Sequence, residues 1–132
     1  TDGIDHIGIA THSLDEHSDF WETLGFMRDS DEINQEQGVK IRFFKPPSGG
    51  PKVELLEPLT DDSPIGRFLQ KRGEGVQQIA VQINDIHGMI ARLQSIGIRM
   101  INNNPVDGAN GSKIAFIHPS STGGVLVELV EH

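Results

Sequence analysis

The sequence predicts an α+β fold made of two copies of one β-α-β-β-β module, which we attribute to internal duplication. The segment from His6, HIGIATHSLDEHSDFWETLGF, matches the segment from Gln78, QIAVQINDIHGMIARLQSIGI, without a gap. The similarity resumes at the end of each half, where FFKPPSGG corresponds to FIHPSSTGG, and KVELLEP to LVELVEH. The repeat therefore covers most of the chain and predicts equivalent strands and helices in both halves.

Each copy begins with the pattern of a strand followed by a capped helix. In the first copy, Ile7 and Ile9 alternate with small residues, as in a half-buried strand. Ser13 and Glu16 then match a capping box, and a glycine follows the helix at position 25. The second copy has the same order at equivalent positions: Ile79, Val81 and Ile83, then Asn84 or Asp85 as cap, then Gly97. The first helix also carries Phe20, Trp21 and Leu24, which we expect to face the core.

The remaining segments set the expected organisation of a single domain, residues 1–132. Each copy should end in a hairpin and a closing strand, so that the first module occupies residues 1–58 and the second residues 75–132. Between them, Ser63 and Pro64 predict the start of a connector helix within residues 59–74.

Composition excludes several classes of protein. The net charge of −8 argues against nucleic acid as a partner, since binding to nucleic acid needs a clustered positive surface. The chain contains no cysteine, which excludes disulfides and thiolate metal sites. No apolar run approaches the roughly 20 residues needed to span a membrane. We therefore expect a cytoplasmic protein, or one of the mitochondrial matrix if an upstream targeting segment has been removed.

Four positions that the repeat makes equivalent in pairs carry side chains able to bind a metal ion. His6 and Gln78 begin the first strand of each copy, and Glu54 and Glu128 stand in the closing strands between large apolar residues. Any one of them alone is more simply a hydrogen-bonded or solvated side chain. A carboxylate repeated in two mostly apolar strands, however, is costly unless it is paired or bound to a metal.

The predicted set offers one nitrogen and three oxygen donors. Such a set favours Co²⁺, Mn²⁺, Mg²⁺ or Ni²⁺ in octahedral geometry over structural zinc. Four protein ligands would leave two coordination positions for substrate or water.

The duplicated pattern resembles the vicinal oxygen chelate superfamily, which includes glyoxalase I, extradiol dioxygenases, bleomycin-binding proteins and methylmalonyl-CoA epimerases. The runs VELLEPLTDDSPIGRFLQKRGEG and IAFIHPSSTGGVLVEL are most similar to the epimerase family. The resemblance implies a curved mixed sheet around a central metal site. It puts the metal ligands at His6, Glu54, Gln78 and Glu128, with Gln78 standing where epimerases usually have histidine.

The resemblance also implies the chemistry. Epimerases invert C2 of methylmalonyl-CoA, and the family's glutamate that matches Glu128 acts as a catalytic base beside its metal contact. Some members carry a second glutamate at the position of Ile41, which cannot transfer a proton, so another carboxylate or a water molecule must do so here. Co²⁺ is the ion we expect first, with Mn²⁺, Mg²⁺, Ni²⁺ or Zn²⁺ as alternatives.

Three further residues are candidates for binding an acyl-CoA substrate. His118 occupies a position where epimerases commonly have histidine, and Lys113 and Ser121 lie near the polar loop of residues 101–113 and the glycine hairpin. Ordinary loop or turn roles are the alternative for all three. A homodimer is also expected. Two other functions share the fold: a glyoxalase I-like lactoylglutathione lyase, and a non-catalytic protein that binds small molecules.

Overall fold

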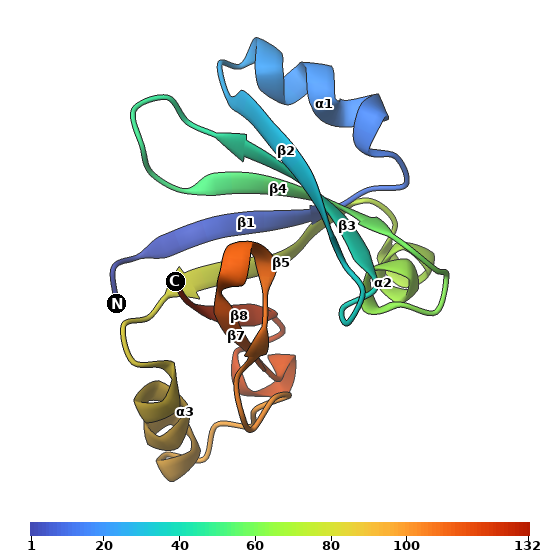
Figure 1. Cartoon of the computed structure of the whole chain (residues 1–132). Coiled ribbons are helices and arrows are strands. Elements are labelled where there is room, and N and C mark those ends of the chain that lie inside the picture. The colour runs from blue at the N-terminus through green and yellow to red at the C-terminus, as the bar shows by residue number, and fades with distance from the viewer. The chain divides into compact units, whose positions relative to one another are not determined.

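The structure, a computed structural model, describes all residues from 1 to 132 and divides into two compact units. One unit comprises residues 6–77, and the other comprises residues 1–5 with 78–132. The elements of the first half are β1 (Ile4–Ala10), α1 (Leu14–Thr23), β2 (Met27–Asn34), β3 (Val39–Lys45), β4 (Lys52–Pro58) and α2 (Pro64–Arg72) (Figure 1). Those of the second half are β5 (Gly75–Gln82), α3 (Ile86–Ser95), β6 (Val106–Asp107), β7 (Lys113–Ile117) and β8 (Val127–Glu131).

The two halves have the same strand order and the same register. The first is ordered β2-β3-β4-β1 and the second β6-β7-β8-β5. The first and last strands pair in parallel in each half, with Ile7 beside Val53 and Ile79 beside Val127. These pairs are equivalent in the repeat, so the α+β class and the β-α-β-β-β order of each module are confirmed.

The ends of the helices follow the predicted caps. The Ser13 hydroxyl accepts a hydrogen bond from the backbone N–H of Glu16, and Gly25 follows α1 with φ of 109°. Of the two candidate caps for α3, the structure selects Asp85, whose carboxylate accepts from the N–H of Gly88. All three helices have only nine or ten residues, and none combines the length and the apolarity that crossing a membrane requires.

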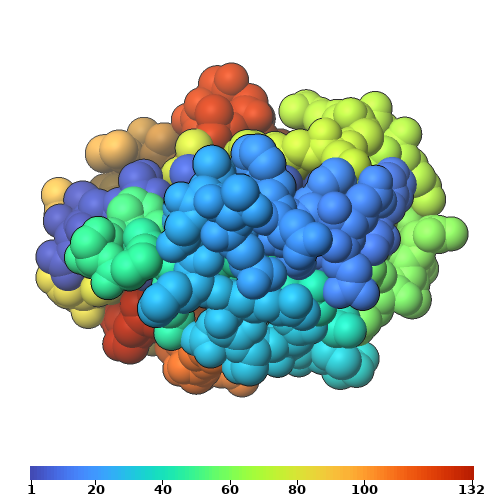
Figure 2. All heavy atoms as spheres, turned by 90° about the horizontal axis from the view of Figure 1, so that it is seen from above, coloured from blue at the N-terminus to red at the C-terminus, as the bar shows by residue number.

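The prediction for the apolar face of α1 was wrong in part. Leu14 is buried against Phe44, Val53 and Leu55, and Trp21 packs on the edge of this cluster. These contacts put residues 14, 18 and 21 toward the sheet, and the i, i+4 pair Phe20 and Leu24 falls outside that stripe, with 59% of each residue exposed. Figure 2 shows this helix, in blue, at the front of the molecular surface.

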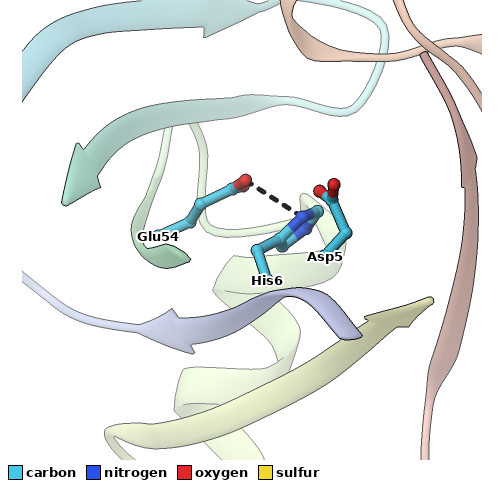
Figure 3. Close-up of side chains that lie close together, drawn as sticks. All are labelled: Asp5, His6 and Glu54. Carbon is cyan, nitrogen blue, oxygen red and sulfur yellow. Dashed lines mark ion pairs between the residues drawn. The ribbon is translucent and has the colours of Figure 1, made fainter. Parts of the chain in front are cut away.

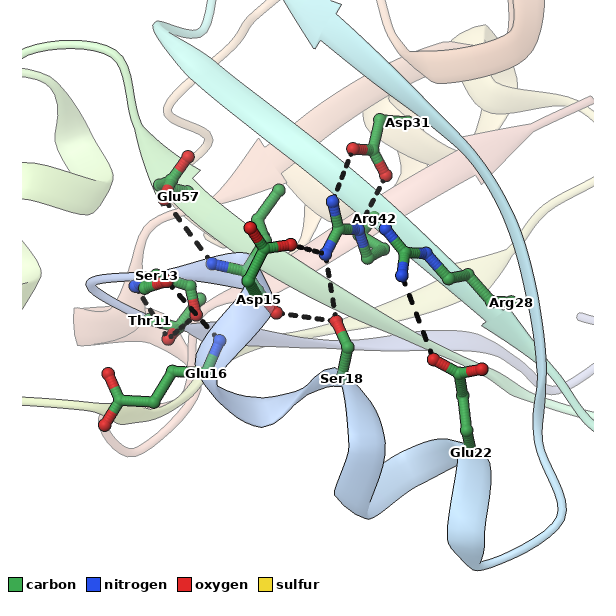
Figure 4. A network of polar contacts seen from close by, with 11 residues as sticks. Thr11, Ser13, Asp15, Glu16, Ser18, Glu22, Arg28, Asp31, Arg42 and Glu57 are labelled. Carbon is green, nitrogen blue, oxygen red and sulfur yellow. Dashed lines mark hydrogen bonds and ion pairs between the residues drawn. The ribbon is translucent and has the colours of Figure 1, made fainter.

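Arg42 on β3 joins α1 to β2 through a buried guanidinium group, which the sequence analysis did not identify. It donates to both carboxylate oxygens of Asp31 at 2.8 Å, to Asp15 at 2.7 Å and to the Ser18 hydroxyl at 3.0 Å (Figure 4). These hydrogen bonds lower the pKa of both aspartates. The hydrogen bonds that Arg42 donates to Asp31 are also the largest cause of the raised pKa of Arg42, against the opposing effect of burial.

We expect Arg42→Met to reduce the free energy of unfolding by about 2 to 4 kcal/mol, because the apolar stem is kept while a buried, charge-assisted network is lost. Asp15→Asn is the control: the Asp15 side chain is 87% exposed, and exposed ion pairs contribute little. Urea unfolding measures both variants. Equal, small losses would mean that the network does not stabilise the module.

The connector is an ordered helix, as its capping residues predict. Ser63 caps α2, Pro64 is its first residue and Gly73 ends it. Just beyond, the Glu74 carboxylate accepts from the backbone N–H of His12 and the hydroxyl of Thr11, and these hydrogen bonds lower its pKa to about 2. Because the folded-state pKa lies below the ordinary value of 4.5, this stabilisation is present above that pH and is lost as the pH falls toward 2.

Candidate metal and substrate site

His6 on β1 and Glu54 on β4 lie side by side on the face of the first module's strands that points away from α1. Glu54 on β4 pairs with Gly8 on β1, and His6 precedes Gly8 by two residues, so its side chain points to the same face. The His6 Nδ1 atom is 3.1 Å from the Glu54 Oε2 atom (Figure 3). Both side chains are buried.

Gln78 and Glu128 repeat this arrangement in the second unit. Glu128 on β8 pairs with Ala80 on β5, and Gln78 precedes Ala80 by two residues. The Gln78 Nε2 atom donates to the Glu128 Oε1 atom at 2.6 Å, and both residues are buried. The sequence predicted these four residues as one set of metal ligands, and the structure brings them together as two pairs, one within each module.

Small and aromatic neighbours shape the surroundings of each glutamate. Gly8 and Ala80 stand directly beside Glu54 and Glu128 on one side. On the other side, Phe43 pairs with Glu54 and Phe116 pairs with Glu128. Each carboxylate thus stands between a small residue and a phenyl ring on the neighbouring strands.

The chemistry of the donors suits a divalent ion. Each module buries one carboxylate within hydrogen-bonding distance of a second metal-binding side chain, and burial of charge without compensation is expensive. Since Gln78 uses its nitrogen toward Glu128, its carbonyl oxygen is the atom available as a ligand. Imidazole nitrogen and carboxylate or amide oxygen are all donor types that bind divalent ions.

Ile41 is buried on β3, beside Leu56 of β4. By strand alternation it shares the face of Phe43 and Glu54. Its position is equivalent to Ile114 of β7, which is also buried, so both modules place an aliphatic side chain here. No proton can be exchanged at either residue.

The three substrate candidates lie in or near the β7–β8 hairpin and have intramolecular contacts. The His118 Nδ1 atom accepts from the N–H of Ser120, and the Ser121 hydroxyl accepts from the N–H of Arg99. Lys113, with 54% of its side chain exposed, pairs with Asp107.

The second glutamate of each closing strand was missed by the sequence analysis. Glu57 follows Glu54 by three residues, and Glu131 follows Glu128 by three. Both accept a hydrogen bond from the first residue of the helix in their own module. The available signal was the spacing E-x-x-E, which is repeated in both closing strands. Residues three apart in a strand point to opposite faces, so this spacing predicts one glutamate on each face of the sheet.

The two modules place the protein in the class of α+β proteins built from a repeated β-α-β-β-β unit, here with one buried carboxylate beside a second polar side chain in each unit. A family model described as the Glyoxalase/Bleomycin resistance protein/Dioxygenase superfamily matches residues 5–116. The chain belongs to this superfamily, which confirms the resemblance predicted from the sequence.

Known proteins similar to the chain include several epimerases. The mitochondrial methylmalonyl-CoA epimerase of Dictyostelium discoideum is 38% identical over 130 residues, which cover 97% of this chain and 77% of the relative. The crystal structure of methylmalonyl-CoA epimerase from Mycobacterium tuberculosis superposes with a TM-score of 0.93 at 40% identity, covering 98% of this chain and 87% of the other. A methylmalonyl-CoA epimerase in complex with methylmalonyl-CoA and NH4+ gives a TM-score of 0.92 at 41% identity, with 98% and 94% covered.

Proposed function

We propose that the chain is an isomerase, a metal-dependent epimerase that interconverts (2R)- and (2S)-methylmalonyl-CoA. The observation that carries this proposal is the likeness, at 41% identity and over nearly the full length, to an epimerase solved with methylmalonyl-CoA. The predicted enzyme class agrees with the names of the relatives. The two buried carboxylates are the groups that proton transfer and metal binding both need.

We further propose that His6, Glu54, Gln78 and Glu128 bind one divalent ion, with Co²⁺ preferred. The support is that each module already holds one buried carboxylate beside its partner at equivalent positions of the strands. When bound, the ion would supply Lewis-acid stabilisation of the negative charge that develops on the thioester oxygen as C2 loses its proton. The single domain of residues 1–132 stays a prediction.

Glu128 is the proposed base for the C2 proton. The Gln78 amide, which donates to one of its oxygens at 2.6 Å, restricts the orientation of the carboxylate. A positioned carboxylate is the usual acceptor for a proton next to a carbonyl group. Since Ile41 cannot serve the other face of C2, the second transfer requires another carboxylate or a water molecule.

Among the substrate candidates, Lys113 offers an exposed positive charge for the carboxylate or the phosphates of an acyl-CoA. One ring nitrogen of His118 and the hydroxyl of Ser121 already accept hydrogen bonds from backbone N–H groups. These two residues would therefore contact a substrate through their other atoms, or after these hydrogen bonds have broken. The homodimer and the cytoplasmic or mitochondrial location stay predictions.

A direct test uses metal-depleted protein and one pure epimer. After addition of Co²⁺, Mn²⁺ or Zn²⁺, the circular dichroism of methylmalonyl-CoA should decay as the epimers interconvert, fastest with Co²⁺ or Mn²⁺. In parallel, the hemithioacetal of glutathione and methylglyoxal should not be converted. Conversion of the hemithioacetal without epimerisation would establish the glyoxalase alternative instead.

Gln78→His should keep the fold and raise the affinity for Ni²⁺ and Zn²⁺ by about 10-fold or more, because imidazole is a stronger ligand for these ions than an amide oxygen. Isothermal titration with each metal measures the change. Gln82→His, on the same face of the same strand, is the matched control and should leave the affinities unchanged. Equal effects of the two substitutions would show that Gln78 is not a ligand.

A further inference from the structure

The closing strand of each module carries two glutamates that point to opposite faces of the sheet. Glu54 and Glu128 lie on the face away from the helix, where they meet His6 and Gln78 respectively. Glu57 and Glu131 point to the helix side, because an interval of three residues reverses the facing in a strand. The same division appears in both modules.

On the helix side, each second glutamate accepts a hydrogen bond from the first residue of the helix. The Glu131 Oε1 atom lies 2.9 Å from the backbone nitrogen of Ile86. The Glu57 Oε1 atom lies 3.4 Å from the backbone nitrogen of Leu14, and Figure 4 shows Glu57 with this hydrogen bond. Ile86 is fully buried and Leu14 is 2% exposed. Their N–H groups cannot find a partner within the helix, so the glutamates remove an unpaired buried donor.

This contact is distinct from the ordinary helix caps. Ser13 and Asp85, the capping residues, bond to the third residue of their helices, Glu16 and Gly88. Caps of that kind act within one segment of the chain. Glu57 and Glu131 instead join the closing strand to the helix that follows the first strand of the module.

The closing strand connects this contact to the metal-ligand candidates. In each module one more backbone hydrogen bond follows the last pair of the parallel strands. In the first module the N–H of Thr11 donates to the carbonyl of Leu56, and in the second the N–H of Ile83 donates to the carbonyl of Val130. The very next residue of the closing strand is Glu57 or Glu131. If the closing strand slid along its parallel neighbour, Glu54 or Glu128 would move with it. The same movement would break the hydrogen bond from the helix to Glu57 or Glu131.

We propose that Glu57 and Glu131 are positioning residues, which hold each ligand glutamate in register with His6 or Gln78. The inference rests on the proposed function, since it assigns their effect to the metal site. The negative charge also suits the N-terminal end of a helix dipole, which strengthens the contact. The shorter distance at Glu131 predicts the larger effect there.

The test compares Glu131→Ala with Asp85→Ala. Both remove a hydrogen bond from the start of α3 and should lower Tm to a similar extent, but only the first releases β8 from the helix. We expect Glu131→Ala to weaken Co²⁺ binding by about 10- to 100-fold, the usual effect of losing a residue that supports a ligand. Asp85→Ala should change it by less than about twofold, and Glu131→Gln, which keeps an oxygen acceptor, should recover most of the affinity.

A second measurement separates this inference from the proposed function. In the metal-free protein, the NMR signals of the Gln78 side-chain amide report its hydrogen bond to Glu128. Glu131→Ala should shift them and Asp85→Ala should not, whether or not the wild type binds metal. If Glu131→Ala prevents folding, Glu57→Ala with Ser13→Ala as control gives the same comparison on the ring signals of His6. Identical signals and affinities in each variant and its control would show that the glutamates are helix caps alone.

Discussion

Glu128→Gln should lower the rate of C2 proton exchange by about 10² to 10⁴, the usual cost of losing a positioned general base. The substitution keeps the size of the side chain and one oxygen donor, so the ion should still bind with reduced affinity. It removes the proton acceptor from a buried position beside Gln78. Deuterium washout from each C2 epimer, measured separately at saturating Co²⁺, gives the rate for the face that Glu128 serves.

Saturation with metal distinguishes a base from a ligand. If Glu128 only binds the ion, raising the Co²⁺ concentration should restore most of the rate in the variant. Glu54→Gln is the matched control, because it removes the equivalent carboxylate of the first module without removing the proposed base. Near-normal exchange from both epimers in Glu128→Gln would remove this residue from the proton path.

His6→Ala should abolish tight metal binding, because the remaining candidates offer only oxygen donors. Residues that merely support a ligand change metal affinity by about 10- to 100-fold, so losing a ligand should cost more than about 100-fold. His17→Ala is the control: this histidine is hydrogen-bonded to Glu74 on the surface of the same unit and is not in the proposed set. Titration of both variants with Co²⁺ decides the matter, and equal affinities would place the ion elsewhere.

The sequence predicted the modules and their pairings well because both follow from local pattern. Alternation around Ile7 and Ile79 fixes which side chains share a face, and the repeat fixes which strands are equivalent. These two facts made His6 equivalent to Gln78 and Glu54 equivalent to Glu128, whereas the contacts within each module came from the structure. The helix caps were equally readable, since Ser13 and Ser63 act on residues close in sequence.

Contacts between distant segments were not predictable in the same way. The burial of Arg42 depends on Asp31 and Asp15, which come from different elements and have no distinctive spacing. The exposure of Phe20 depends on which side of α1 faces the sheet. The sequence does not distinguish an apolar residue on that side from an apolar residue next to it. Glu57 and Glu131 had a signal in the repeat, but their role became visible only with the hydrogen bonds to α1 and α3.

Incorporation of solvent deuterium tests the central claim most directly. Metal-depleted protein is supplied with Co²⁺ and incubated in deuterium oxide with (2R)- or (2S)-methylmalonyl-CoA, and the deuterium content of C2 is followed by mass spectrometry. We expect rapid labelling of C2 from both epimers. The labelling should decrease in the Glu128→Gln variant and should be lost when the ion is chelated. Labelling no faster than in buffer alone, with the ion bound, would contradict the central claim.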